Sequence, residues 1–316
     1  MTRHGDHEGG APRHDADRGA VMPSRSPVEL FVTLHGRDDA YVMALAAMYA
    51  SMRSHTAASL RFTIVHDASV RQDSLDRVAA FIRERDEAHL VNIEAHPDID
   101  ALARECADAR YSPAVLWRVF APDLMPDSAK VLLVDADLVF LCDVLRLWEV
   151  DVSNAAIAAV RRGKPWPAEY HDLIETPSDR YFRIGLSVLN LQRMRQDERF
   201  RTTRASFLRT RLPAINALVC LPEQSVFNYF FSGSARPLEA TLVPAGHFNP
   251  ADERAVARLL GTMDCGGTLV LDLKGWQHRS PFDYFYWSYL LLTPWRAQAY
   301  AELVAHQRGG RPSHAG

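Results

Sequence analysis

Two carboxylates separated by one residue, Asp135 and Asp137, follow an apolar run in the stretch KVLLVDADLV. The apolar run has the length and composition of a buried strand, so both acids lie where that strand ends. Burying two unpartnered carboxylates would cost several kcal/mol, and we therefore expect them to be solvated, paired with cations or bound to a metal. Their spacing lets both face one side, and hard oxygen ligands of this kind suit Mn²⁺ or Mg²⁺ carrying a diphosphate.

Taken alone, this pair has two other interpretations. One is a solvated turn at the end of a strand, which is the better choice for an isolated Asp-x-Asp. The other is a phosphatase, because DADLV also matches the pattern of haloacid-dehalogenase-like enzymes, with Asp135 as nucleophile and Asp137 as general acid/base. That chemistry needs the nucleophile on an early strand and a downstream acidic pair, whereas this motif lies in mid-chain. The sequence around the pair must therefore distinguish between a metal site, a solvated turn and a phosphatase.

The residues before the pair alternate between strand and helix patterns. Strands are predicted over residues 28–34, 60–67, 89–96 and 130–135, and helices over 39–52, 69–85 and 112–125. Strands separated by helices of this length predict an α/β fold with a mostly parallel central sheet flanked by helices. Ligands of such sheets bind outside the carboxyl ends of the strands, which is where Asp135 and Asp137 lie.

The two ends of the chain differ in composition from its centre. Residues 1–26 are rich in Gly, His, Asp, Arg and Pro without hydrophobic periodicity, so we expect a disordered tail. Residues 301–316 predict a flexible tail for the same reason. Between them, residues 27–300 show neither a long linker nor an internal repeat, which predicts a single domain.

The composition is that of an ordinary globular protein, with 316 residues, 47% hydrophobic content and a formal net charge of −3. Interspersed charges give no basic patch for nucleic acid, and we expect no such partner. The apolar runs fall short of the roughly 18 residues of a membrane span, and the start lacks a signal-peptide core, so we expect a cytoplasmic protein without a stable membrane anchor. The four cysteines lack metal-ligand spacing, which predicts reduced thiols.

An ordered series of motifs resembles glycosyltransferase family 8, the retaining nucleotide-sugar transferases with a GT-A, Rossmann-like fold. The central motif, Val115 to Asp151, combines an arginine-bearing helix, the strand that ends in Asp-x-Asp, and DVLRLWEVD. The other motifs are GRDDAYVMALAAMYASM (36–52), YFRIGLSVLNLQRMR (181–195), LPEQSVFNYFF (221–231) and VPAGHFNP (243–250). The order of the series, rather than any one motif, carries the resemblance over residues 28 to 285.

The resemblance implies which residues hold the nucleotide. Asp38 would hydrogen-bond the uracil base, and the ring of Tyr41 would stack on it, as an aromatic face can do with a planar base. Packing of Tyr41 in the core at a helix start is an equally good interpretation without the resemblance. Ala136, between the two acids, belongs to the same binding set.

The resemblance also implies the metal site and the catalytic group. Asp135 would contact both ribose and metal, Asp137 would ligate the metal, and Arg118 would lie near the donor sugar and these acids. An ion pair between Arg118 and one of the two aspartates is the alternative. Gln224 would lie on the reactive face of the sugar, where it can orient or stabilise but is a weak nucleophile. Asn190 and Asn228 match recurrent polar positions, and we expect structural roles for them.

A late segment departs from the family pattern. In LDLKGWQHRSPF (271–282), Asp272 stands where the family has a metal-binding histidine, and His278 stands in place of a lysine that contacts the diphosphate. Gly275 aligns with the family's glycine. An aspartate can ligate Mn²⁺ through oxygen, whereas a neutral histidine is a poorer diphosphate partner.

The donor-sugar region departs as well. Arg183 replaces an expected asparagine, and Ser225 replaces the second acid after Gln224. Adding a cation and removing a carboxylate favours a donor that carries a carboxylate, such as a uronic acid. Pairing of Arg183 with Glu223 is the alternative.

Together these features predict a retaining glycosyltransferase that moves a sugar from a UDP-sugar to a hydroxyl of a small-molecule acceptor, such as a natural product. A divalent metal would assist departure of the diphosphate. Two alternatives stay open: a non-catalytic relative that still binds nucleotide, and, with less support, the phosphatase that uses Asp135 and Asp137. The sequence does not predict the oligomeric state.

Overall fold

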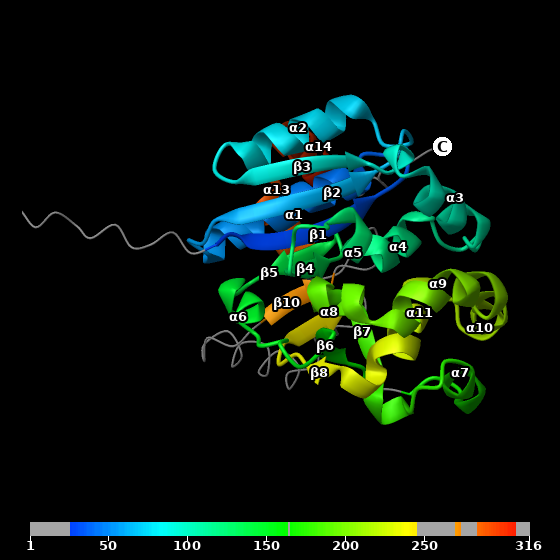
Figure 1. Ribbon diagram of the computed structural model, residues 1–316. Coiled ribbons are helices and arrows are strands. Elements are labelled where there is room, and N and C mark those ends of the chain that lie inside the picture. Colours follow the sequence, from blue (N-terminus) through cyan, green and yellow to red (C-terminus); the bar gives the residue numbers. More distant parts are fainter. Residues whose placement is uncertain (1–25, 164, 245–268, 273–282, 308–316) are drawn as a thin grey trace, which may run out of the picture.

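A seven-stranded sheet forms the centre of the computed structural model, which describes residues 26–163, 165–244, 269–272 and 283–307 (Figure 1). Its strand order is β3-β2-β1-β4-β7-β6-β8. The strands are β1 Val28–Leu34, β2 Leu60–His66, β3 Glu87–Asn92, β4 Lys130–Val134, β6 Ile157–Arg161, β7 Phe182–Asn190 and β8 Arg236–Pro237. Four of its six strand pairings are parallel, and the two that involve β7 are antiparallel. The prediction of an α/β fold with a mostly parallel sheet is confirmed.

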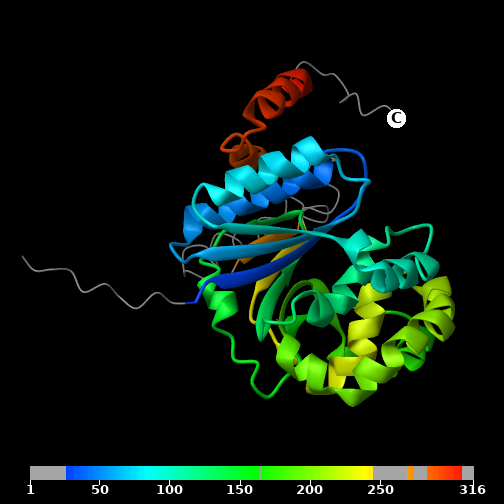
Figure 2. The same cartoon turned by 45° about the horizontal axis from the view of Figure 1, so that its top comes forward.

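Both faces of the sheet are covered, which explains why its central strands are apolar on both sides. Within β1, Leu30 and Val32 belong to the core beneath α1 and α2, whereas Phe31 belongs to the core on the other face. Figure 2 shows α1 (Ala40–His55) and α2 (Gln72–Arg83) on one face and a larger group of helices on the other. The opposite group comprises α3 Pro97–Glu105, α4 Ala114–Trp117, α5 Ala121–Leu124, α7 Ala168–Leu173, α8 Leu191–Gln196, α9 Glu198–Thr210, α10 Leu212–Leu218 and α11 Pro222–Phe231.

Helix α1 is buried along nearly its whole length, which fits its apolar composition on all sides. A small second sheet, of order β5-β10-β9, supplies part of that cover. Its strands are β5 Leu138–Phe140, β9 Thr241–Pro244 and β10 Leu269–Asp272. Helix α13 (Asp283–Leu290) also packs on α1, and α6 (Leu145–Trp148) and α14 (Arg296–Gln307) complete the described chain.

Three expectations need adjustment. The helix expected over residues 112–125 is broken into α4, a 3₁₀ turn (Arg118–Phe120) and α5, because Pro122 has no amide hydrogen with which to continue a regular helix. Helix α3 was not predicted, and it takes up residues after the third strand. The domain end expected at residue 300 falls inside α14.

The described part of the chain also bears on the thiols and on membranes. Cys106, Cys142 and Cys220 are free thiols, as predicted, and Cys265 lies outside the described residues. None of the helices described is both long and apolar enough to cross a bilayer. Residues 1–25 of the expected N-terminal tail lie outside the described residues.

Candidate active site

Asp135 and Asp137 lie in the turn between β4 and β5, at the carboxyl edge of the main sheet. They are only 7% and 8% exposed, so the interpretation of a solvated turn is wrong. Ala136 between them is buried as well. Two carboxylates this deeply buried require partners, because desolvation penalises the charged form.

Arg118 is the cation that meets this requirement for Asp135. Its Nη1 donates to Oδ1 of Asp135 at 2.5 Å, and its Nε donates to Oγ1 of Thr33 at the end of β1, 3.2 Å away. The guanidinium is itself buried, with only 8% of the residue exposed. Burial acts to lower the pKa of Arg118, but the charges of nearby carboxylates, with Asp135 foremost, outweigh it and raise that pKa above its usual range.

Gly185 on β7 makes room for the Asp135 carboxylate. The backbone N–H of Asp135 donates to the carbonyl oxygen of Gly185 at 2.8 Å. A Cβ atom on residue 185 would lie 2.1 Å from Oδ2 and 2.8 Å from Cγ of Asp135. No side chain fits there while the Arg118–Asp135 pair is kept. The sequence motif over residues 181–195 contains Gly185, but the sequence did not indicate a role for this glycine. The need for a residue without a side chain opposite Asp135 becomes visible only when β4 and β7 are paired.

Asp272 reaches the same edge through the small second sheet. It ends β10, and its register partner on antiparallel β5 is Leu138, the residue that follows Asp137. Its side chain is buried, with 5% of the residue exposed. The pairing therefore brings Asp272 next to the Asp135–Asp137 turn, although the two segments are more than a hundred residues apart in sequence.

The donor set has the chemistry of a divalent cation site, since it consists of buried carboxylate oxygens with a hard-ligand preference. Within the described ranges, however, no three His, Cys, Asp or Glu side chains lie close enough together to enclose a metal. The fit to Mn²⁺ or Mg²⁺ thus rests on Asp135 and Asp137, with Asp272 at their side. Gly275 and His278, the other predicted residues of this segment, lie outside the described residues.

Arg183, two residues before Gly185, is about one-third exposed at the rim of the site. Its Nη1 lies 3.8 Å from Oδ2 of Asp272. Glu223, the partner considered from the sequence, lies 3.9 Å from Nη1 of Arg118. Arg162, just after β6, is a second cation nearby: burial lowers its pKa, and the charge of Arg183 adds to the effect.

Gln224 lies in the first turn of α11, which begins at the same edge of the site. The residue is 8% exposed, and its carboxamide makes no hydrogen bond within the part of the chain that the structure describes. A carboxamide that the described residues leave unused, beside a cluster of acids, can form hydrogen bonds with a ligand that reaches this edge.

Asn190 and Asn228 have the structural roles expected for them. The side chain of Asn190 accepts from the backbone N–H of Arg193 at the start of α8. Asn228 bonds both backbone groups of Phe182, accepting from its N–H at 3.0 Å and donating to its carbonyl oxygen at 2.9 Å. These bonds fix α11 against the start of β7.

Asp38 and Tyr41 lie on the loop after β1 and on the first turn of α1. Asp38 is exposed, and its Oδ1 accepts from the backbone N–H of Ala40 at 3.2 Å. Tyr41 is 50% exposed, so core packing at the helix start, the alternative considered for it, is wrong. Both residues follow β1, the strand that adjoins β4, so they lie at the same edge as Asp135, but their contact with a base stays a prediction.

Comparison with known proteins identifies the family to which this chain belongs. Residues 32–245 match the model of "Glycosyl transferase family 8". General stress protein A of Bacillus subtilis is 23% identical over 167 residues, which are 50% of this chain and 55% of that protein. The chain thus spans about half the length of this curated relative.

Solved structures share the fold. The bifunctional glycosyltransferase WbbM has a TM-score of 0.64 at 18% identity, with 90% of this chain and 53% of that one covered. The galactosyltransferase LgtC, solved with donor and acceptor sugar analogues, has a TM-score of 0.63 at 17% identity, with 86% of this chain and 100% of that one covered. GlyE of Streptococcus pneumoniae has a TM-score of 0.53 at 16% identity, with 92% and 66% covered. The expected GT-A fold is confirmed.

Proposed function

Since this chain belongs to glycosyltransferase family 8, we propose that it is a retaining glycosyltransferase which moves a sugar from a UDP-sugar to a hydroxyl of a small-molecule acceptor. The observation that carries the proposal is the buried pair of Arg118 and Asp135 beneath Gly185, with Asp137 and Gln224 at the same sheet edge. Burying several charged groups together costs stability, and such groups cluster at functional sites. These residues also lie at the sheet edge where ligands of α/β folds bind.

Asp135 and Asp137 would hold a divalent cation, with Asp272 as the candidate third ligand. A bound Mn²⁺ or Mg²⁺ supplies charge that stabilises the departing diphosphate. Arg118 fixes the rotamer of Asp135 through Nη1 and is itself held by Thr33, so the carboxylate is oriented before any ligand arrives.

Gln224 would serve the donor sugar. Its carboxamide has hydrogen-bonding capacity that the described residues do not use, and the residue lies in the first turn of α11. A carboxamide can orient the sugar and stabilise positive charge that develops at the anomeric carbon, but it is a poor nucleophile. We therefore favour attack by the acceptor hydroxyl on the leaving-group side, through an oxocarbenium-like state, over a covalent intermediate.

Of the two alternatives drawn from the sequence, one remains beside this proposal. The family assignment leaves the phosphatase without support. A relative that binds nucleotide but does not transfer sugar is still consistent with the geometry, because the late segment with Gly275 and His278 lies outside the described residues.

Calorimetric titration with UDP and with UDP-sugars, each with and without Mn²⁺, tests the proposal. We expect binding that depends on the metal, followed by slow hydrolysis of the donor and faster transfer when an acceptor from a panel of hydroxyl-bearing small molecules is added. Metal-dependent binding without hydrolysis or transfer would support the non-catalytic relative. Absence of binding in both conditions would refute a UDP-sugar donor.

We further propose that the donor sugar carries a carboxylate. Arg183 lies at the rim with a long contact to Asp272 at 3.8 Å, and its charge acts on nearby Arg162, so a second anion beside these two cations would be stabilised. We expect kcat/KM to be higher for UDP-glucuronate than for UDP-glucose, and Arg183→Asn to reverse the preference by roughly 10-fold or more, the worth of one charge-assisted hydrogen bond. Arg180→Asn, an exposed change nearby, is the matched control. A wild-type preference for the neutral sugar would refute the idea.

A further inference from the structure

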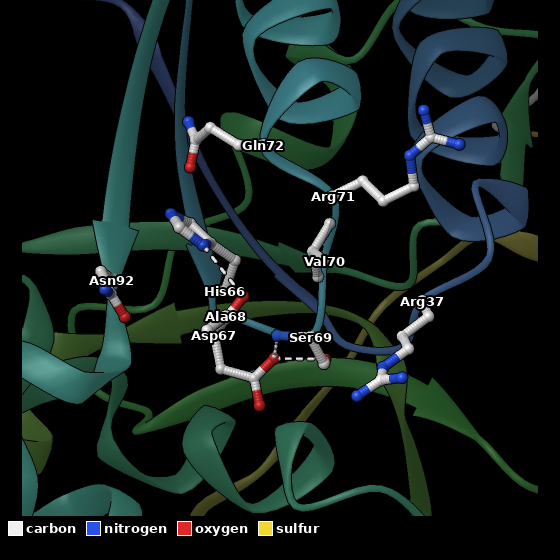
Figure 3. Close-up of a pocket in the computed structure, with 9 residues that line it drawn as sticks. All are labelled: Arg37, His66, Asp67, Ala68, Ser69, Val70, Arg71, Gln72 and Asn92. Carbon is white, nitrogen blue, oxygen red and sulfur yellow. Dashed lines mark hydrogen bonds between the residues drawn. The ribbon is translucent and has the colours of Figure 1, made fainter.

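A second polar pocket lies along the same sheet edge, apart from Asp135. It has a volume of about 630 Å³ and opens at the carboxyl ends of β2 and β3, beside the start of α2 (Figure 3). Strand β1 separates β2 from β4, so the pocket lies roughly 10 Å, two strand spacings, from the strand that carries Asp135. None of the residues discussed for the donor lines it.

The β2–α2–β3 crossover brings three polar side chains, a histidine and two carboxamides, into this pocket. His66 ends β2 and Asn92 ends β3, and the two are register partners in the parallel pair. Gln72 is the first residue of α2. In Figure 3 the imidazole of His66 points to the side of the pocket where the carboxamides of Gln72 and Asn92 lie.

His66 is unusual because it is buried without a strong partner. The residue is 7% exposed, and its one hydrogen bond within the described residues is a long contact of 3.4 Å between Nδ1 and the carbonyl oxygen of Asp67. When Nδ1 carries the proton and donates to that carbonyl, Nε2 is an unused acceptor on a pocket-lining ring. Because this ring lines the pocket, a ligand that enters the pocket can donate a hydrogen bond to Nε2.

The two carboxamides complement this acceptor. Nε2 of Gln72 donates to Oδ1 of Asp76 at 2.9 Å, so its Oε1 remains available to accept. Oδ1 of Asn92 accepts from the backbone N–H of Glu94 at 3.0 Å, so its Nδ2 remains available to donate. His66, Gln72 and Asn92 thus offer two acceptors and one donor on this side of the pocket. A hydroxyl group both donates and accepts, and vicinal hydroxyls match such a mixed wall.

An anion fits this wall poorly. Figure 3 shows the Arg71 guanidinium turned away from the His66 side and the Arg37 guanidinium beside Ser69, across the pocket from His66, and Arg71 already pairs with Asp73 at 2.5 Å. Asp67, which also lines the pocket, stays ionised: burial acts to raise its pKa, but hydrogen bonds from Ser69 and other donors outweigh this and lower it. Arg104 already pairs with that carboxylate at 2.8 Å, so neither charge calls for an anion from the pocket.

We propose that this pocket binds a neutral sugar ring, through hydroxyl contacts with His66, Gln72 and Asn92. The inference goes beyond the transfer reaction, because the site is separate from the Asp135 cleft and needs neither metal nor nucleotide. A ring held here would be one unit of a glycan that reaches past the reacting centre.

NMR of the full chain, labelled with ¹⁵N at histidine, tests this. Signals of His66 are assigned with His66→Gln, and the probes are the methyl glycosides of glucose, galactose and N-acetylglucosamine. We expect a saturable shift of His66 Nε2 with at least one glycoside, weakened about 10-fold or more by Asn92→Asp, which keeps the acceptor for Glu94 but removes the donor. His89→Gln, an exposed change on the same strand, should leave the affinity unchanged.

Three further probes separate the other outcomes. Inorganic phosphate alone shifting His66 would overturn the proposal in favour of an anion site. UDP with Mn²⁺ alone shifting it would assign the pocket to the donor. No response of His66 to any glycoside up to tens of millimolar, in a protein whose histidine spectrum is otherwise native, would also overturn it. Because the glycoside arm uses neither nucleotide nor metal, its failure is distinguishable from failure of the proposed transfer reaction.

Discussion

Replacing Gly185 by alanine is the sharpest test of how the site is built. The new Cβ would lie 2.1 Å from Oδ2 and 2.8 Å from Cγ of Asp135, whereas real Cβ contacts essentially never fall below 3.0 Å. The carboxylate must therefore move by roughly an ångström. The backbones cannot separate easily, because the N–H of Asp135 is bonded to the carbonyl oxygen of residue 185 at 2.8 Å. The side chain must rotate instead, and rotation breaks its 2.5 Å bond to Arg118.

The expected cost follows from three effects. Overpacking a well-packed position costs about 1–3 kcal/mol, and weakening a charged hydrogen bond costs about 1.5–3 kcal/mol. An alanine in a strand is favoured over glycine by roughly 0.5–1 kcal/mol, which offsets part of the loss. Because the strand preference of alanine offsets part of these costs, we expect a net loss of about 1–3 kcal/mol in the free energy of unfolding and loss of metal-dependent UDP binding.

Equilibrium urea unfolding of four variants checks the reasoning. Gly233→Ala is the control, since a Cβ there meets nothing within 4 Å, and it should stay within about 0.5 kcal/mol of wild type. Asp135→Ala removes the obstructing carboxylate, so adding Gly185→Ala to it should cost nothing. The reasoning is refuted if the alanine at 185 is as destabilising without the Asp135 carboxylate as with it, because the clash would then lie elsewhere.

Three further predictions concern individual charges. Asp137→Asn should abolish Mn²⁺-dependent UDP binding in calorimetry while leaving the urea midpoint nearly unchanged, and an unchanged UDP affinity would contradict a metal–diphosphate site. Arg118→Met leaves the buried Asp135 carboxylate without its cation, so the free energy of unfolding should fall by about 3–5 kcal/mol. A loss below roughly 1 kcal/mol in urea unfolding would show that the ion pair does not stabilise the fold. The fold lowers the pKa of Asp67, so the ionised carboxylate stabilises the protein at neutral pH, and this stabilisation is lost as the pH falls below about 4. Asp67→Asn should lower the free energy of unfolding by about 1–3 kcal/mol at pH 7. In urea unfolding, the difference in stability between wild type and Asp67→Asn should become smaller towards about pH 3, and a larger difference at that pH would contradict this prediction.

Local sequence patterns determined the framework of this protein. Alternating apolar strands and helices predict the parallel part of the sheet, and the strand boundaries of β1 and β2 agree with the structure within a residue. The position of Asp135 and Asp137 after an apolar run placed the site at the carboxyl edge. These features are readable because hydrophobic periodicity and strand-end chemistry depend on residues near one another in the chain.

The tertiary structure decided how the site is assembled. Nothing in a strand's own sequence states its direction, and it is the antiparallel course of β7 that sets Gly185 across from Asp135. The same holds for Asp272, which reaches the site through pairing of β10 with β5. The burial of Asp135 and Asp137 also cannot be predicted from an isolated Asp-x-Asp motif. The carboxylate of Asp135 is buried because Arg118 pairs with it and because Gly185, distant in the chain, has no side chain that would occupy its place.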